Sequence, residues 1–300
     1  MCSSDLAALL VTAPPARAQV ANLLGDAGMD YGKAVAADPD GNLYLGLYFD
    51  GTVDFDPGPG EATRTASGFV DTAIARYDRG GNLSWVAHLT NTLPAAGLAD
   101  IPHAVALDGA TGLVHAGYFS GTLDFDPGPD SILRTSRGGY DMYLSRWDTD
   151  GRHLWTRTLG NTNGATEERF YDAAVGPDGT IFACGYFQGT VTPDGLAHFT
   201  GGGLQDGLVV AFDRDGACLR GFSFGSASND QCDAIAPDGA GGLYVLGHFG
   251  GTVDMDPGPA ASNLASTGYS DCVLARYDAT TFALEWAVLL GGASFDFGAP

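Results

Sequence analysis

The chain has 300 residues, of which 45% are apolar, and a formal net charge of −22. This length and apolar content are enough to bury a sizeable core. The negative charge argues against binding to nucleic acid and to an anionic membrane surface, because both require a basic face. Forty-five glycines, fifteen prolines and an excess of aspartate over glutamate indicate many turns, which is typical of an all-β protein with short connections.

The first residues resemble a processed targeting segment. An apolar run from Leu6 to Ala13 precedes Ala16-Arg17-Ala18, a small-residue cleavage pattern before Gln19. The run is too short to span a bilayer, and Met1–Asp5 resembles a translated adapter sequence where a basic region is expected. Residues 1–18 are therefore predicted to be an adapter-like scar and a truncated signal peptide, and the protein is expected to be secreted or on the bacterial surface. A cytosolic protein with a chance apolar start is the alternative.

One pattern then recurs four times, with Phe49, Phe119, Phe187 and Phe249 each followed by x-Gly-Thr-Val or x-Gly-Thr-Leu. The steps between these phenylalanines are 70, 68 and 62 residues. Every copy contains a short apolar strand, a tight turn, a strong second strand, and a third strand framed by two aspartates seven residues apart. A fourth strand carries Trp85, Trp155 or Trp286, with Arg220 in the third copy. Repeats of this length indicate stacked supersecondary units.

The third strand of each copy indicates the architecture. Ala73–Tyr77 and Val273–Tyr277 do not alternate apolar with polar residues, and strands of this kind are covered on both faces. Small sheets covered on both faces occur in the blades of a β-propeller. A β-sandwich would show cleaner alternation, and a parallel β-helix would have shorter repeats.

The sequence therefore predicts an all-β propeller with four recognisable four-stranded blades of about 62–70 residues within 19–300. The predicted blades are 31–95, 101–163, 170–228 and 231–292, and a further blade is expected to start at 293–300. The chain is accordingly interpreted as a fragment of a larger propeller.

Each copy is longer than common propeller repeats, and the excess lies between the second and third strands. Thr52–Phe55 and Ala62–Thr65 are able to pair across a Pro-Gly turn. We expect an inserted hairpin on the same rim of every blade, which is where repeat proteins often place a binding surface.

The combined motifs resemble the SBBP-type β-propeller repeat of bacterial secreted and surface proteins. The matching segments include Asp38–Tyr44, Gly117–Thr122, Asp54–Pro59, and Ala75–Asp78 followed by Gly81–Trp85. The resemblance covers Tyr31 to Gly292. The third copy departs from it, with Thr192–Gly195, Ala211 and Arg220 at motif positions. The resemblance implies an extracellular propeller and no known reaction.

Three pairs of aspartates are candidate calcium ligands, because Ca²⁺ takes six to eight oxygen ligands and two carboxylates near a tight turn can contribute to one site. The pairs are Asp54 and Asp56, Asp124 and Asp126, and Asp254 and Asp256. The alternative is that each aspartate accepts backbone hydrogen bonds and shapes its turn. No other cofactor is indicated. A quinone docked on the tryptophans is a minor alternative to their packing in the core.

The aspartates that frame the third strands, at 71 and 78 and at the equivalent positions, are expected to accept backbone N–H groups. Arg76, Arg146 and Arg276 are expected to pair with an aspartate of the same or a neighbouring blade. Cys184, Cys218, Cys232 and Cys272 either pair, with Cys218–Cys232 the favoured bridge, or remain free thiols. No zinc spacing occurs among them.

A unique site is best sought where the repeat breaks. Thr166–Arg169 holds two of the four glutamates, and the histidines at 88, 103, 115, 153, 198 and 248 share no repeat position. Glu167 and Glu168 are expected in a solvated loop, since adjacent strand residues point to opposite faces.

The favoured function is a non-catalytic binding scaffold, with an extracellular glycan or protein as its partner. One alternative is a polysaccharide hydrolase or lyase with its site at the central channel, which a single-blade cluster of His, Glu and Arg would favour. The other alternative is a structural spacer of a larger surface protein.

Overall fold

The computed structural model describes residue 25 and residues 28–92, 99–109, 111–161, 166–192 and 198–296. The predicted targeting segment, 1–18, lies outside these ranges, as do residues 297–300 of the expected further blade. Within the described ranges, no helix is long and apolar enough to cross a membrane.

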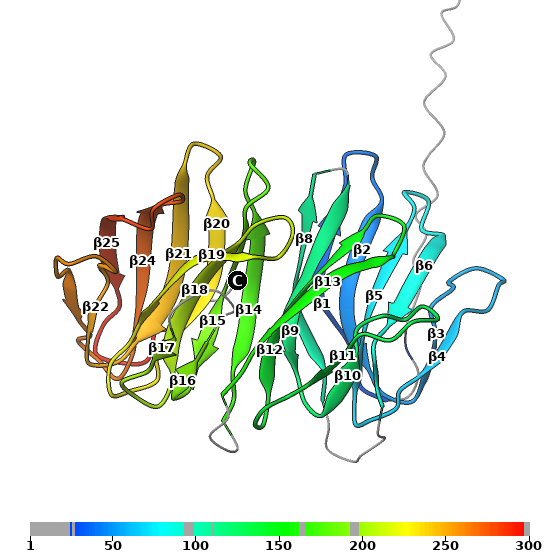
Figure 1. Cartoon of the computed structure of the whole chain (residues 1–300), viewed down its shortest axis with the longest axis horizontal. Coiled ribbons are helices and arrows are strands. Elements are labelled where there is room, and N and C mark those ends of the chain that lie inside the picture. Colours follow the sequence, from blue (N-terminus) through cyan, green and yellow to red (C-terminus); the bar gives the residue numbers. More distant parts are fainter. Residues whose placement is uncertain are drawn as a thin grey trace, which may run out of the picture.

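Four antiparallel four-stranded sheets follow one another along the described chain and stand side by side (Figure 1). Blade 1 consists of β1 (Asp30–Ala37), β2 (Leu43–Phe49), β5 (Asp71–Tyr77) and β6 (Leu83–His88). Blade 2 consists of β8 (Ile101–Asp108), β9 (Gly112–Phe119), β12 (Asp141–Asp148) and β13 (His153–Leu159). Blades 3 and 4 consist of β14 (Arg169–Val175), β15 (Ile181–Phe187), β18 (Asp206–Phe212) and β19 (Cys218–Phe224), and of β20 (Gln231–Pro237), β21 (Gly242–Phe249), β24 (Asp271–Asp278) and β25 (Leu284–Leu290). Within each blade the strands pair in chain order. The first strands of successive blades lie against one another, so each blade runs outward from an inner strand. The predicted β-propeller fold is confirmed.

The turn that joins the third strand to the fourth shows how local chemistry sets the strand ends. In blade 1 the carboxylate of Asp78 accepts the backbone N–H groups of Gly80 and Asn82, at 2.7 and 2.9 Å. Asp148, Asp213 and Asp278 cap their turns in the same way. At the other end of the strand, Asp71 accepts the N–H of Ser67 at 2.8 Å. The expected role of the framing aspartates is confirmed.

Burial follows the predicted pattern in three of the four third strands. Every residue of β18 is buried, and β5 and β12 each have one partly exposed residue. In β24 buried and partly exposed residues alternate. The strands β12 and β18 lie between described blades, and the outer face of β5 is covered by Val53 and Phe55 of its own hairpin. One face of β24 has no such described cover.

The inserted hairpins are β3 (Thr52–Asp54) with β4 (Thr63–Thr65), β10 (Thr122–Asp124) with β11 (Leu133–Thr135), β16 (Thr190–Val191) with β17 (Phe199–Thr200), and β22 (Thr252–Asp254) with β23 (Asn263–Ala265). Strand β7 (Thr90–Asn91), which follows blade 1, pairs with β10 of blade 2. Leu123 and Phe125 are fully buried in a cluster that contains side chains of both blades. The apolar side of the hairpin therefore fills the gap between neighbouring blades and is not presented to solvent on the rim.

Neighbouring blades are also joined near their outer strands. The indole N–H of Trp85 in blade 1 donates to the carbonyl of Thr149 in blade 2, at 3.0 Å, and that of Trp155 donates to Arg214 in blade 3, at 2.9 Å. Arg220, which replaces tryptophan in blade 3, donates from Nη1 to the carbonyl of Ala279 in blade 4, at 3.0 Å. The departure from the motif in the third copy therefore preserves the hydrogen bond between blades.

A buried ion pair supports the joint between blades 2 and 3. Asp108 is 1% exposed and accepts from Nε of Arg146 in its own blade and from Nη2 of Arg214 in the next, at 3.0 and 2.8 Å. Arg276 pairs with Asp238 in the same manner within blade 4. The expected pairing is thus confirmed for Arg146 and Arg276.

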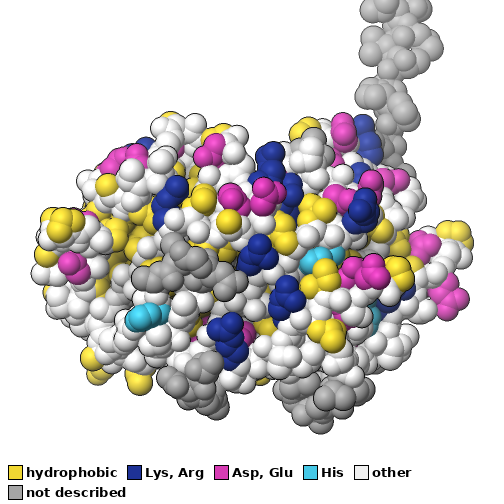
Figure 2. Space-filling view, in the orientation of Figure 1, with side chains coloured by type: hydrophobic (Ala, Val, Ile, Leu, Met, Phe, Trp, Pro, Cys, Tyr) yellow, Lys and Arg dark blue, Asp and Glu magenta, His cyan; other side chains and the backbone are white. Residues whose placement is uncertain are grey.

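Figure 2 shows basic side chains along the middle of the view, over blades 2 and 3.

Candidate functional sites

The six aspartates proposed as calcium ligands lie in three equivalent hairpin turns. Asp54 accepts the backbone N–H groups of Asp56 and Ala62, at 3.0 and 2.8 Å, and Asp56 accepts that of Gly58, at 2.8 Å. The pairs Asp124 with Asp126 and Asp254 with Asp256 make the same bonds. The N–H groups of Ala62 and Asp56 hold the pKa of Asp54 below its usual value.

The geometry explains the aspartates as turn formers. Within the described ranges no group of three His, Cys, Asp or Glu side chains is placed to hold a metal ion. Calcium binding at these turns stays a prediction.

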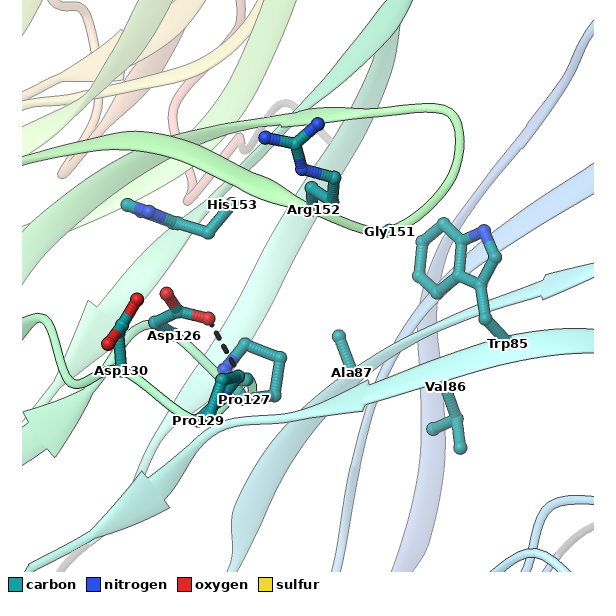
Figure 3. A pocket seen from close by; sticks show the side chains of 11 residues that line it. Trp85, Val86, Ala87, Asp126, Pro127, Pro129, Asp130, Gly151, Arg152 and His153 are labelled. Carbon is teal, nitrogen blue, oxygen red and sulfur yellow. Dashed lines mark hydrogen bonds between the residues drawn. The ribbon is translucent and has the colours of Figure 1, made fainter.

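A cleft of about 500 Å³ lies beside one of these turns, between blades 1 and 2. In Figure 3 Asp126 and Asp130 lie on one side of it, Trp85 on the other, and Arg152 and His153 above. Most of this lining belongs to the repeat: the Asp-Pro-Gly-Pro turn, the outer-strand tryptophan and the turn on which that tryptophan packs. The cleft is therefore a consequence of how blades join.

Residues that differ from blade to blade gather on the rim where the inner strands begin. Each inner strand has a register shift near its start, and the residue in the bulge is Lys33, His103, Tyr171 or Asp233. The residue two positions before the bulged one also varies, and is Arg169 in blade 3 and Gln231 in blade 4. This rim is where a unique site can form on a repeated frame.

Arg169 is the centre of the most concentrated set of these side chains. Its guanidinium lies over the rings of Tyr118, Tyr140 and Tyr186, with Cζ 4.5, 5.4 and 6.0 Å from the ring centroids. Nη2 donates to Oε2 of Glu167 at 2.5 Å. Its Nε has no hydrogen-bond partner among the described residues.

The aromatic cluster around Arg169 continues to His103 of blade 2. The His103 ring lies 5.0 Å from the Tyr171 ring, edge to face, and the Tyr171 ring lies 5.7 Å from that of Tyr186. Glu167 also accepts from the Tyr186 hydroxyl at 3.4 Å. We call Tyr118, Tyr140, Glu167, Arg169 and Tyr186 the tyrosine cage.

Burial and charge set the titration of these groups. Burial, together with the nearby Lys33 and Arg169 cations, lowers the pKa of His103 to about 3. Burial raises the pKa of Tyr118 to about 12 and also raises the pKa values of Tyr171 and Tyr186. At neutral pH the histidine and these three tyrosines are therefore uncharged.

The expectation that both glutamates lie in a solvated loop is wrong for Glu168, which is fully buried. It accepts the backbone N–H of Asn161 at 3.2 Å. Asp100 and Asp230 precede the inner strands of blades 2 and 4 in the same way and accept N–H groups from the residue that follows the second strand, and Asp230 also from Ser226 in the preceding connection. Glu168 is the corresponding acid of the repeat in blade 3. The alignment of Glu168 with Asp100 and Asp230 is the sequence signal that the prediction missed.

Glu168→Gln is expected to change how stability depends on pH. Burial raises the Glu168 pKa to about 7 from an unfolded value near 4.5, so the folded state binds this proton more tightly than the unfolded state. The stability from protonated Glu168 is fully present below about pH 4.5 and is lost as pH rises through about 7, a loss of about 3 kcal/mol.

We therefore expect urea unfolding to show Glu168→Gln gaining about 3 kcal/mol relative to the wild type between pH 4.5 and pH 8. Glu61→Gln, at an exposed position in the hairpin of blade 1, is the control and should follow the wild type. Parallel pH curves for the wild type and Glu168→Gln would contradict the assignment.

A second pocket lies on the same rim between blades 3 and 4 and measures about 380 Å³. Asn229, Gln231, His248 and Tyr269 line it, and Phe295 stacks on Tyr269 at 5.0 Å. His248 bonds Asp233 at 2.8 Å through Nδ1. Four of the six histidines, at 88, 103, 115 and 248, lie in blade interiors or on this rim, which their scattered sequence positions did not predict.

The favoured disulfide is not present. None of Cys184, Cys218, Cys232 and Cys272 is in a disulfide, and the thiol of Cys232 hydrogen-bonds that of Cys184. Cys218 instead contacts the carbonyl of Arg220. Proximity in sequence misled the prediction because Cys218 opens an outer strand and Cys232 lies in the inner strand of the next blade.

Comparisons with known proteins assign the chain to no family. No protein-family model matches the chain. Over 209 residues, 67% of this chain, it is 28% identical to the regulatory protein FlaEY of Caulobacter vibrioides, of which it spans 20%.

Among solved structures, a protein of unknown function from Bacteroides caccae aligns with 72% of this chain and 68% of its own, at 14% identity and a TM-score of 0.34. A Hadza microbial sialidase aligns with 88% and 60%, at 12% identity and a TM-score of 0.32. A quinohemoprotein alcohol dehydrogenase from Pseudomonas putida aligns with 90% and 64%, at 9% identity and a TM-score of 0.31. The class of this chain, four blades of the propeller type, rests on its own sheets.

Proposed function

We propose that the protein is a secreted, non-catalytic binding module of the SBBP type that binds an extracellular glycan through its tyrosine cage. The observation that carries the proposal is Arg169, held over three tyrosine rings with one N–H donor unpaired. Tyr118 and Tyr186 are buried and support the guanidinium. The partly exposed ring of Tyr140 offers flat apolar surface, and the partly exposed Arg169 and Glu167 offer directional hydrogen bonds. Sites for small ligands combine these features.

The titration of the cage favours binding over catalysis. A general acid or base works best with a pKa near the operating pH. The pKa of His103 is about 3 and that of Tyr118 about 12, while Glu167 is ion-paired with Arg169. Glu167 and Arg169 come from blade 3 and His103 from blade 2, so the single-blade cluster that would favour a hydrolase or lyase is not formed by them.

Binding to a panel of immobilised neutral and uronic-acid polysaccharides tests the proposal. Arg169→Lys keeps the charge and loses the planar fork of donors, so we expect at least about a tenfold loss of affinity for the polysaccharide that binds. Tyr140→Ala should show a similar loss. Phe69→Ala, an exposed aromatic on the rim of blade 1, is the matched control and should bind as the wild type does.

No binding to any polysaccharide would contradict the glycan proposal and favour a protein partner or the spacer. Release of reducing ends from the panel would instead support the enzyme alternative. Calcium at the hairpin aspartates is part of the proposal, and a melting temperature that is equal in calcium and in EGTA would remove it.

A further inference from the structure

Each joint between two described blades contains a pair of buried carboxyl groups. One is the aspartate that opens the third strand of a blade, and the other is the acid that precedes the inner strand of the next blade. None of these side chains is more than 4% exposed, so each carboxyl group needs hydrogen-bond donors or a cation beside it. The pairs are Asp71 with Asp100, Asp141 with Glu168, and Asp206 with Asp230.

Side chains supply these partners at the joint between blades 1 and 2. Oδ2 of Asp71 accepts from the Ser67 hydroxyl at 2.9 Å and bonds Nε2 of His88 at 2.8 Å. Oδ2 of Asp100 accepts from Nδ2 of Asn91 at 2.6 Å. This pair of acids is therefore satisfied by the protein itself.

The backbone does the same at the joint between blades 3 and 4. All four carboxyl oxygens of Asp206 and Asp230 accept a backbone N–H group. Two of the three joints therefore need no partner from outside the protein.

The joint between blades 2 and 3 differs, because only one oxygen of each acid is bonded. Oδ1 of Asp141 accepts the N–H of Arg137 at 3.0 Å, and Oε2 of Glu168 accepts the N–H of Asn161 at 3.2 Å. Oδ2 of Asp141 and Oε1 of Glu168 have no hydrogen-bond partner among the described residues. No ion pair of the described residues includes either acid.

Substitutions in the repeat explain these two open oxygens. Arg137 has no hydroxyl to offer, and Thr158 has no ring nitrogen. The amide of Asn161 donates from Nδ2 to the carbonyl of Gln188 at 2.8 Å. These three residues, Arg137, Thr158 and Asn161, stand at the positions that Ser67, His88 and Asn91 occupy in the preceding joint.

The two open oxygens belong to one place in the fold. Gly160 and Asn161 are consecutive, and a Cβ on Gly160 would collide with Oδ2 of Asp141, while Asn161 bonds Glu168. Burial, and after it the charge of the nearby Asp141, raises the pKa of Glu168 to about 7. The hydroxyl of Thr166 lies beside Glu168, and its Oγ1 has no hydrogen-bond partner among the described residues either.

We propose that Asp141 and Glu168 bind one calcium ion at the joint between blades 2 and 3. The open oxygen of each carboxylate is a ligand, and so is the Thr166 hydroxyl. Backbone carbonyls and water complete the six to eight oxygen atoms that Ca²⁺ takes. Two acidic side chains hold this site, so it falls outside the groups of three acidic, His or Cys side chains considered above. An all-oxygen set of ligands suits Ca²⁺ and not the softer transition metals.

The ion fastens two segments of chain that already lie side by side. Tyr140 and Glu167 form a parallel bridge, and each is the direct neighbour in sequence of one proposed ligand. In the calcium-free protein the open oxygens leave the pair protonated, because burial raises the pKa of Asp141 to about 6 and that of Glu168 to about 7. The pH dependence predicted above for Glu168→Gln is that of the calcium-free protein.

Calorimetric titration of the full chain with calcium chloride tests the proposal, at about pH 8 so that the ligands are deprotonated. We expect one ion to bind at this joint, and the melting temperature to rise by about 5 °C at a free calcium concentration about 100 times the Kd. Asp141→Asn and Glu168→Gln each remove one charged ligand and should weaken calcium binding at least about tenfold. Both variants also remove a buried charge, so they should remain folded.

A third variant separates this site from the hairpin turns. Asp54→Asn, Asp124→Asn and Asp254→Asn combined remove a carboxylate from each hairpin and should leave the calcium response of the wild type at this joint intact. No heat of binding together with equal melting temperatures in calcium and EGTA would overturn the proposal. A response that survives in Asp141→Asn and in Glu168→Gln would overturn it as well. No glycan enters these measurements, so their outcome is independent of the proposed glycan binding.

Discussion

Phe125→Ala is expected to lower the free energy of unfolding by about 3–5 kcal/mol. Phe125 is fully buried in the hairpin of blade 2, and its ring packs edge to face on Phe119 at 5.4 Å. The same cluster contains Ile74 and Ala87 of blade 1. Removing the ring leaves a cavity between two blades that the surrounding sheets are too rigid to close.

Urea unfolding followed by tryptophan fluorescence measures the loss. Phe69→Ala makes the same chemical change at a position that is 53% exposed, and it should cost less than about 1 kcal/mol. Equal costs for the two variants would mean that the hairpin does not hold the blades together, and would restore the view of it as a free binding loop.

Arg146→Met should also lower the free energy of unfolding by about 3–5 kcal/mol, because it leaves Asp108 buried with only one of its two cationic partners. The Nε and Nη2 groups of Arg146 both donate to Asp108. Asp108 is 1% exposed, so water cannot replace the lost donors. Methionine keeps much of the side-chain volume, so the change reports on charge more than on packing.

Two further variants show whether the loss of stability comes from the buried Arg146–Asp108 ion pair or from the removal of any positive charge. Arg152→Ala alters an arginine whose side chain is 81% exposed and should change the free energy of unfolding by less than about 0.5 kcal/mol. Combining Arg146→Met with Asp108→Asn removes the buried charge and should recover much of the loss. A double variant as unstable as the sum of its single changes would contradict this account.

The strands and their order were predictable because local signals and tertiary packing agree in them. Leu43–Phe49 and its equivalents are apolar runs bounded by Asp-Gly turns, and the absence of alternation in the third strands predicted cover on both faces. The backbone hydrogen bonds of the framing aspartates and the pairing of Arg146 and Arg276 followed from the same repeat logic.

What the sequence did not predict depends on contacts between blades. In the sequence Phe125 lies between two aspartates of a polar turn, and nothing there indicates burial. In the structure the neighbouring blade covers its ring. Arg220 stands in blade 3 where blade 2 has Trp155, and the sequence alone indicates a lost motif. The structure shows that both side chains donate a hydrogen bond to a turn of the next blade. The tyrosine cage joins Tyr118 and Tyr140 to Arg169 across two blades, and no spacing rule within one repeat brings these residues together.

The bulge near the start of each inner strand has a consequence for how such a protein acquires new ligands. A bulged residue stands outside the pairing ladder, so its side chain can change without shifting the register of the sheet. Lys33, His103, Tyr171 and Asp233 occupy this one position in four blades and are basic, aromatic and acidic in turn. Evolution can therefore exchange these side chains one at a time on a constant scaffold, much as antibodies vary their loops on a fixed framework.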